Sequence, residues 1–213
     1  TEYLAMRAGG VPVLMTMMHG GLRVALQTGH VPLEQVAERI DPESLTSSLH
    51  LLGGSLMSLF GMRTPRVAVL GLNPHAGDGG VLGRQEREIL EPVIREFEGG
   101  RRGMEDGSEG MEPRGRMTVD GPFPADAFFA RQRWRGYDAV LTMYHDQGLI
   151  PFKMLDEGRG VNVTLGLPFV RTSPDHGTAF DIAGRGVASP DSMAAAMRLA
   201  GQMCRRKMAG GGR

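Results

Sequence analysis

The sequence contains a single cysteine, Cys204, among 213 residues. A disulfide within the chain is therefore excluded, and the low cysteine content favours a reducing compartment, so we expect a cytoplasmic protein. Basic and acidic side chains number 24 each, which makes the formal net charge zero. Because nucleic-acid binding depends on a surplus of basic residues, this balance argues against a nucleic-acid partner. No apolar run approaches the roughly 18 residues of a membrane-spanning helix, and the first residues form no signal-peptide pattern, so no membrane partner is expected.

Lysine is also scarce. The 24 basic residues comprise 22 arginines and only two lysines, Lys153 and Lys207, so a lysine in this chain is a candidate for a specific role. Glycine, in contrast, is abundant, with 32 of the 213 residues. This is about twice the usual share of roughly 7%. It predicts many tight turns, since glycine adopts backbone conformations that other residues avoid.

The order of the apolar segments predicts an α/β fold. Near-continuous apolar runs are typical of buried parallel strands, whereas a period of 3.6 residues is typical of helices. Because the two kinds of segment alternate, we expect a largely parallel sheet covered by helices. Residues 99–116, rich in glycine and charge, predict a solvated insertion. Strands are predicted at 66–72, 137–144 and 161–167, with a hairpin or two buried strands at 11–18 and 22–28, and helices at 1–8, 31–40, 43–61, 85–98 and 189–208.

Two loops that follow predicted strands each carry a histidine with an aspartate nearby. His75 and Asp78 lie in NPHAGDGG, and His145 and Asp146 lie in HDQG. Ligands of open α/β sheets bind at the carboxyl ends of the strands, so the two loops can meet at one site. Imidazole is the commonest metal ligand, and a neighbouring carboxylate fixes its tautomer, so the pair predicts a metal site. Catalytic sites usually have three protein ligands, and histidines that merely bond to loop backbone fit these residues too.

A second set of polar residues lies in or beside apolar segments. Lys153 occurs in IPFKML, Asn162 lies in VNVTLGL, and Arg171 follows LGLPFV. An unpaired ammonium group is unfavourable in apolar surroundings, so we expect an anionic partner for Lys153. A phosphate or carboxylate ligand would satisfy all three donors. Three unrelated structural contacts would explain the same residues, and both hypotheses stay open at this point.

The remaining histidines and glycines carry less information. The glycines at 77, 79, 80 and 83 have a spacing one residue longer than the dinucleotide-binding fingerprint, and we interpret them as a tight turn. His19, His30 and His50 lack supporting neighbours, so we interpret them as structural or exposed. Cys204 is predicted to pack on the apolar side of the last helix.

Four long motifs resemble the 4-hydroxythreonine-4-phosphate dehydrogenase family of vitamin B6 biosynthesis. They are LNPHAGDGGVLG, GPFPADAFF, AVLTMYHDQGLIPFK and GRGVNVTLGLPFVRTSPDHGTAFDIAGRG. The resemblance implies the α/β/α sandwich of the isocitrate and isopropylmalate dehydrogenases, with a mostly parallel sheet. It also implies a metal-dependent, NAD- or NADP-linked oxidation of 4-phosphohydroxy-L-threonine to 2-amino-3-oxo-4-phosphobutanoate. Decarboxylation to 3-amino-2-oxopropyl phosphate would follow.

The same resemblance assigns roles to residues. It implies that His75 and His145 bind a divalent metal, which can be zinc, magnesium or cobalt, in a site shared between the subunits of a homodimer. Asp146 and Asp126 are candidates for supporting the metal ligands or transferring protons. The substrate-binding residues implied by the resemblance are Lys153, Asn162 and Arg171. HGTAFDIAGRG resembles the adenosine-contacting loop of the isocitrate and isopropylmalate dehydrogenases, which implies cofactor contacts from His176, Gly177, Thr178 and Asp181.

The chain departs from the family pattern at its start. A third metal-binding histidine belongs to a GHTEYLA-like motif, and this chain begins at TEYLA, so we expect the C-terminal portion of a longer enzyme. Residues 1–170 are expected to form the metal- and substrate-binding, dimer-forming region, and residues 171–213 to return to the cofactor domain. Two alternatives remain. One is a related dehydrogenase for a four-carbon phosphosugar acid or an aromatic-acid dihydrodiol, and the other is an inactive piece with a binding or structural role.

Overall fold

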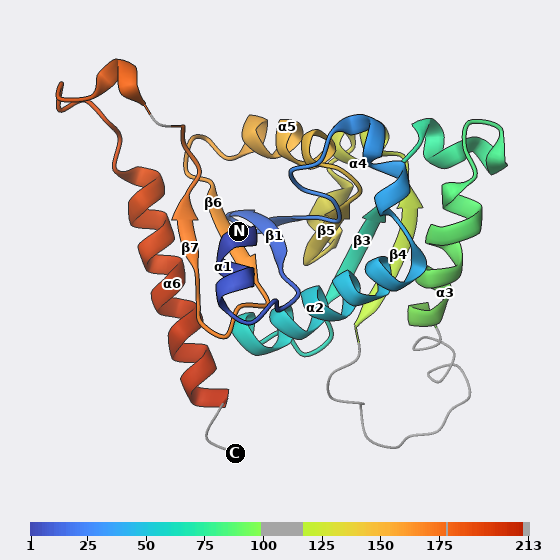
Figure 1. Cartoon of the computed structure of the whole chain (residues 1–213), viewed down its shortest axis with the longest axis horizontal. Helices are drawn as coiled ribbons and strands as arrows, with labels where there is room; N and C mark the ends of the chain where they lie inside the picture. Colours follow the sequence, from blue (N-terminus) through green and yellow to red (C-terminus); the bar gives the residue numbers. More distant parts are fainter. Residues whose placement is uncertain (99–116, 178, 211–213) are drawn as a thin grey trace.

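The described part of the chain forms one seven-stranded sheet with helices on both faces (Figure 1). The computed structural model describes residues 1–98, 117–177 and 179–210, so the insertion expected at 99–116 lies outside the described residues. Across the sheet, the strands are β4 (Thr118–Phe123), β3 (Arg66–Leu70), β5 (Ala139–Thr142), β2 (Leu22–Leu26), β1 (Leu14–His19), β6 (Val161–Leu165) and β7 (Thr172–Pro174). The α-helices are α1 (Glu2–Arg7), α2 (Pro42–Phe60), α3 (Glu91–Glu98), α4 (Ala125–Ala130), α5 (His145–Leu155) and α6 (Asp191–Gly210).

The sheet is parallel in one half and antiparallel in the other. β4, β3, β5 and β2 pair in parallel, whereas β1 pairs antiparallel with β2 and β6, and β6 pairs antiparallel with β7. Because β2 and β6 are both antiparallel to β1, five of the seven strands share one direction. The expected α/β fold with a mostly parallel sheet is therefore confirmed, as is the hairpin of β1 and β2.

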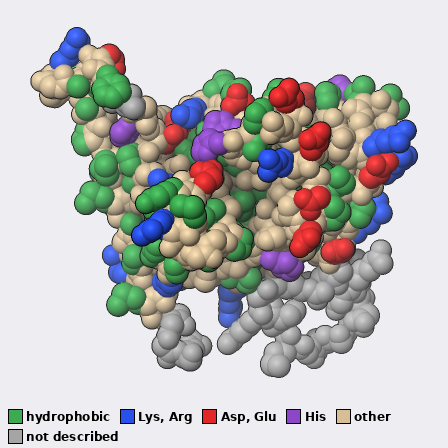
Figure 2. Space-filling model, viewed as in Figure 1, with side chains coloured by type: hydrophobic (Ala, Val, Ile, Leu, Met, Phe, Trp, Pro, Cys, Tyr) green, Lys and Arg blue, Asp and Glu red, His purple; other side chains and the backbone are tan. Residues whose placement is uncertain are grey.

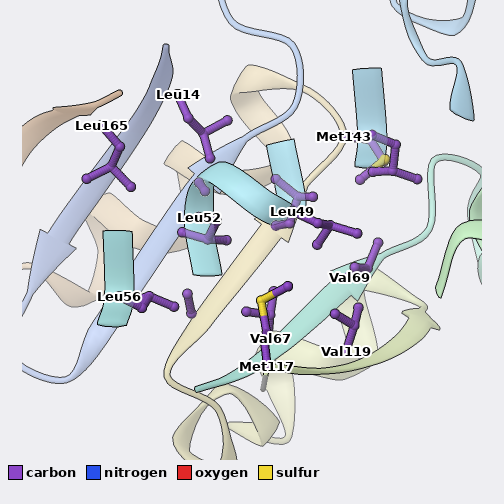
Figure 3. Packing of buried hydrophobic residues seen from close by; sticks show 14 of the residues in the cluster. Leu14, Leu49, Leu52, Leu56, Val67, Val69, Met117, Val119, Met143 and Leu165 are labelled. Atoms are coloured by element: carbon purple, nitrogen blue, oxygen red, sulfur yellow. The ribbon is translucent and has the colours of Figure 1, made fainter. Parts of the chain in front are cut away.

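Helix α2 covers one face of the sheet and carries the larger apolar core. The Asp41 carboxylate accepts a hydrogen bond of 2.9 Å from the backbone N–H of Ser44, which starts the helix. Four leucines of α2, Leu45, Leu49, Leu52 and Leu56, recur at the helical period and are fully buried. Figure 3 shows Leu49, Leu52 and Leu56 packed against the sheet in this core. Helices α3 and α6 contribute to the same core.

The opposite face is covered by α4 and α5. Phe128 of α4 and Phe152 of α5 are buried in a second core with Val24 of β2 and Val140 of β5. Residues two apart in a strand share a face, so the two cores take alternate side chains of the same strands. Three layers result, and the predicted α/β/α sandwich is confirmed.

Several local predictions are wrong. Residues 31–40 form two 3-10 turns, Leu33–Gln35 and Ala37–Arg39, because only Val36 and Ile40 are buried and no continuous apolar stripe exists. Residues 86–90 form a π-helical turn ahead of α3. β4 and α5 were not predicted as regular elements. β4 contains Gly121-Pro122, and α5 contains Pro151, residues that usually interrupt such elements.

Helix α6 packs against the sheet through Ala196 and Met203. Cys204 is exposed, so the prediction that it packs in the core is wrong. Consecutive helical residues are rotated by about 100°, and the residue after buried Met203 is turned towards solvent. The proposed division of the chain at residue 170 stays a prediction.

Acidic and basic side chains are interspersed on the face shown in Figure 2, in keeping with their equal numbers. Among the residues that the structure describes, no helix combines the length and apolarity needed to cross a bilayer.

Candidate functional site

The carboxyl ends of neighbouring parallel strands carry the predicted metal ligands. β3 and β5 pair with Val69 opposite Leu141. His75 lies five residues beyond the end of β3, and His145 lies three residues beyond the end of β5. Asp126 lies three residues beyond the end of β4, in the first turn of α4, and is exposed. All three residues therefore follow strands that end at one edge of the sheet, where ligands of α/β folds bind.

The loop that carries His75 has an unusual backbone. Residues 75–79 all have a positive φ, and His75, Ala76 and Asp78 among them are not glycine. Non-glycine residues rarely adopt this conformation, because their Cβ approaches the backbone too closely. Backbone strain of this kind is concentrated at functional sites, so geometry supports the loop as part of a site.

A buried carboxylate holds this loop. Glu86 is 2% exposed, and it accepts hydrogen bonds from the backbone N–H of Asn73 at 2.7 Å and from Asn73 Nδ2 at 2.8 Å. A Cβ on Gly77 would lie 2.7 Å from Glu86 Oε2, so glycine is needed there for close approach as well as for its positive φ. Glu86 was not predicted as a residue of the site. The sequence does offer one indication that Glu86 is buried. It lies four residues before buried Leu90, on the apolar stripe of a predicted helix.

His145 begins helix α5, so the prediction that HDQG is a loop is wrong. Nδ1 of His145 lies 2.7 Å from Oδ1 of Asp146. With its proton on Nδ1, the imidazole donates to this carboxylate and keeps Nε2 as the atom available to a metal. The side chain of His145 is 36% exposed.

A third histidine, His30, lies beside His145, and it was not predicted as a residue of the site. The ring centroids of His30 and His145 are 5.9 Å apart. Thr28 joins the two segments, because its backbone N–H and its hydroxyl both donate to the carbonyl of Met143, at 3.2 and 2.7 Å. The side chain of His30 is 58% exposed, as interpreted from the sequence. One indication of its place beside His145 was available, because His30 lies four residues beyond the end of β2, which pairs in parallel with β5.

His30 and His145 line a cavity of about 360 Å³, together with Tyr144 and Asp146. Nδ1 of His30 lies 3.1 Å from Oε1 of Glu2. A hydrogen bond from its own backbone, and then the bond to His30, lower the pKa of Glu2 from its usual value. Imidazoles, carboxylates and some apolar lining in one concave site suit a small polar organic ligand.

Histidine and aspartate side chains are suitable ligands for a divalent cation, but the described residues of one chain do not supply enough of them in one place. Within the described ranges, no group of three histidine, cysteine, aspartate or glutamate side chains is close enough to hold a metal ion. His145 nevertheless has the orienting carboxylate that metal-binding histidines usually have. A complete site would need a donor from beyond the described residues of one chain.

The predicted substrate residues occur around β6. Asn162 and Thr164 are two residues apart in this strand and share a face. Arg171 donates from Nη1 to Oγ1 of Thr164 at 3.1 Å. Lys153, on the last turn of α5, forms an ion pair of 3.2 Å with Asp175, just beyond β7. The structure thus links Arg171 to β6 and Lys153 to the segment that follows the neighbouring strand.

Lys153 is more exposed than the sequence suggests. Its side chain is 53% exposed, and Asp175 supplies the anionic partner. Two buried oxygens here, Oδ1 of Asn162 and Oδ2 of Asp175, have no hydrogen-bond partner among the described residues. Buried polar atoms normally have a partner, so both can accept a hydrogen bond from a ligand or from water. A phosphate bound here would share Lys153 with Asp175.

The predicted cofactor residues lie in an exposed segment beyond β7. His176 and Gly177 are exposed, and Nδ1 of His176 lies 2.9 Å from the carbonyl of Gly177. Asp181 is exposed in a short 3-10 turn. Thr178 lies outside the described residues. Contact between this segment and a cofactor stays a prediction.

Gly148 allows α5 to approach the sheet next to His145. A Cβ at this position would lie 2.7 Å from Oγ1 of Thr142 and from Cγ1 of Val24. We expect Gly148→Ala to lower the free energy of unfolding by about 1–3 kcal/mol in chemical denaturation, because an added methyl group forces packed neighbours apart. The control is Gly54→Ala in α2, whose Cβ would meet nothing within 4 Å and should stabilise the helix. Equal free energies of unfolding for Gly148→Ala and Gly54→Ala would contradict the close packing of Gly148 against the sheet.

Comparison with known proteins relates most of the chain to one protein family. A family model described as pyridoxal phosphate biosynthetic protein PdxA matches residues 1–200. The protein named 4-hydroxythreonine-4-phosphate dehydrogenase from Ruegeria sp. (strain TM1040) is 47% identical over 97% of this chain, and its namesake from Aromatoleum aromaticum is 48% identical over 98%. These alignments cover 59% and 60% of the two relatives, so the chain spans about three fifths of the curated relatives it matches.

Solved structures share the fold. The 4-hydroxythreonine-4-phosphate dehydrogenase of Klebsiella pneumoniae has a TM-score of 0.76 and 36% identity, over 95% of this chain and 57% of that chain. A terephthalate 1,2-cis-dihydrodioldehydrogenase from Burkholderia xenovorans LB400 has a TM-score of 0.69 and 32% identity, over 94% of this chain and 60% of that chain. The two proteins differ in the substrate that their names give.

Proposed function

Because the chain belongs to the pyridoxal phosphate biosynthetic protein PdxA family, we propose that the full-length protein is a 4-hydroxythreonine-4-phosphate dehydrogenase. In this reaction NAD or NADP oxidises 4-phosphohydroxy-L-threonine at its 3-hydroxyl. The product, 2-amino-3-oxo-4-phosphobutanoate, loses carbon dioxide to give 3-amino-2-oxopropyl phosphate. The observation that carries the proposal is the pair His75 and His145 at adjacent strand ends, with Asp146 on Nδ1 of His145.

His75 of one subunit and His145 of the partner subunit would hold a divalent cation together with a further donor. We therefore propose a homodimer that shares its metal site between subunits. When bound, the ion supplies Lewis-acid stabilisation of the negative charge that develops on the substrate oxygen. Among zinc, cobalt and magnesium, imidazole ligands favour the first two over magnesium, which prefers oxygen ligands.

The other roles belong to side chains of this chain. Asp146 keeps the His145 ring in the tautomer that presents Nε2. Lys153, Arg171 and Asn162 would bind and orient the phosphate of the substrate, with a point charge, a guanidinium fork and an amide. Asp126, exposed at the same sheet edge as His75 and His145, is positioned to exchange protons with solvent.

Two further features of the proposal concern the cofactor and the compartment. His176, Gly177 and Asp181, which are exposed, would contact the adenosine part of NAD or NADP together with Thr178. A cytoplasmic location is proposed because a single cysteine is typical of proteins in a reducing compartment.

Steady-state kinetics of the full-length protein test the proposal. We expect 4-phosphohydroxy-L-threonine to give a kcat/KM at least about 100-fold above that of an aromatic-acid dihydrodiol, because a substrate without a phosphate leaves the phosphate-binding residues unpaired. A four-carbon phosphosugar acid keeps the phosphate but lacks the amino group, so its kcat/KM, which we also expect to be lower, tests recognition of the rest of the substrate. Formation of reduced nicotinamide measures turnover, and a chelator should abolish it. Turnover of the dihydrodiol alone would reject the proposed substrate.

The dihydrodiol dehydrogenase activity is the second candidate. It is favoured by the 32% identity to the Burkholderia xenovorans protein of that name. The ion pair of Lys153 with Asp175 also fits it, because an aromatic-acid substrate needs less positive charge than a phosphate does.

A further inference from the structure

We propose that Gln147 is a positioning residue that clamps together the two segments carrying His75 and His145. The inference rests on the proposed function, in which both histidines bind metal. Gln147 lies in the first turn of α5, two residues after His145, and it is only partly exposed. Its side chain spans the gap between the ends of β3 and β5.

Both ends of the Gln147 carboxamide bond to backbone groups. Oε1 accepts a hydrogen bond of 2.7 Å from the backbone N–H of Met143, at the end of β5. Nε2 donates a hydrogen bond of 2.6 Å to the carbonyl of Gly71, at the end of β3. One partner is a donor and the other an acceptor, so the orientation of the amide is determined. Only a neutral carboxamide of this length satisfies both partners.

The two bonds act on the parts of the backbone that lead directly to the histidines. Met143 precedes His145 by two residues, and Gly71 precedes His75 by four residues. Two residues further along the chain, Glu86 fixes Asn73, so Gln147 and Glu86 together hold the short segment that leads into the His75 loop. Gln147 therefore sets the distance between the two imidazole-bearing segments of one chain. In the proposed two-fold dimer each metal site takes His75 from one subunit and His145 from the partner subunit, so Gln147 acts by fixing where both segments lie within each subunit.

The role differs from that of a general packing residue. Gln147 contacts backbone groups of two segments, one of which, at Gly71, lies 76 residues away from it in sequence, and its two side-chain hydrogen bonds go to backbone and not to either imidazole. Hydrogen-bonded groups that orient metal ligands typically contribute 10–100-fold to metal affinity. We therefore expect metal affinity to fall by this factor when the hydrogen bonds of Gln147 are removed.

The test compares Gln147→Glu, Gln147→Met and the surface control Gln202→Glu in the full-length protein. Gln147→Glu replaces the Nε2 donor by a carboxylate oxygen that faces the Gly71 carbonyl, and Gln147→Met removes both bonds at similar size. Gln202 is exposed on α6. Its substitution by glutamate introduces the same negative charge as Gln147→Glu, at a site away from the two clamping hydrogen bonds. If Gln147→Glu does not fold, Gln147→Met provides the comparison.

Two measurements are made on each protein. Hydrogen exchange of the metal-free protein should be at least about tenfold faster in the Gln147 variants at Met143 and across residues 71–80, since an unpaired amide opens more readily. Titration with Co²⁺ should show about 10–100-fold weaker binding and a changed visible spectrum, which reports the coordination geometry. Gln202→Glu should match the unsubstituted protein in both.

The outcomes separate this inference from the proposed function. Unchanged exchange in the Gln147 variants would show that no clamp exists, whether or not metal binds. Faster exchange with unchanged Co²⁺ affinity and spectrum would overturn the positioning role. An unsubstituted protein that binds no Co²⁺ would reject the metal site of the proposed function, while the exchange data would still decide whether the clamp exists.

Discussion

His145→Ala in the full-length protein should abolish stoichiometric metal binding and lower kcat/KM by about 10³-fold or more. A Lewis-acid metal contributes several kcal/mol to the stabilisation of the transition state, and each 1.36 kcal/mol corresponds to about a factor of ten in rate. Metal analysis and the nicotinamide assay, carried out on the same preparation, measure the two effects together.

The matched control is His50→Ala. His50 is exposed on α2, where its ring packs 5.1 Å from that of Phe97, away from both histidine-bearing segments. Its replacement should leave metal content and turnover near those of the unsubstituted protein. Full turnover in His145→Ala with bound metal would remove His145 from the mechanism.

Glu86→Ala should lower the free energy of unfolding by about 3–5 kcal/mol. Hydrogen bonds to charged groups contribute about 1.5–3 kcal/mol each, and this carboxylate accepts two of them from Asn73 in a buried setting. The loop with His75 would lose its anchor, so metal affinity should fall as well. Denaturant unfolding measures the first effect, and metal titration measures the second.

Glu88→Ala provides the comparison, because Glu88 belongs to the same π-helical turn but has a side chain that is 54% exposed. Its ion pair of 3.8 Å with Arg87 is a surface contact of small expected effect. A destabilisation by Glu86→Ala as small as that by Glu88→Ala would contradict the anchoring role.

Much of the fold could be predicted because its signals are local. β3 and β5 are apolar over nearly their whole length, and α2 shows the helical period together with a capping residue at Asp41. β4 could not be predicted in the same way, since only Val119 within it is buried. The first turn of α5 was predicted as a loop that follows a strand. Gly148 and Pro151 are poor helix residues, but close packing of Gly148 on the sheet favours the helix there.

The site was only partly predictable for a related reason. His75 and His145 were found because each follows a recognisable strand. Glu86, Gln147 and the contact of His30 with His145 depend on segments that meet only in the folded chain. No pattern of residue spacing encodes such contacts. A polar residue on an apolar stripe, as at Glu86, is the strongest indication of them in the sequence.

The turn that presents His75 winds in the sense opposite to that of ordinary helices, with three non-glycine residues in it. Each of these residues costs roughly 1–2 kcal/mol relative to a right-handed conformation. A peptide with the sequence NPHAGDGG would relax out of this shape in water. Transplanting the motif into another scaffold would therefore not carry the histidine's position with it, unless the acidic anchor and the two adjoining strands were transplanted as well.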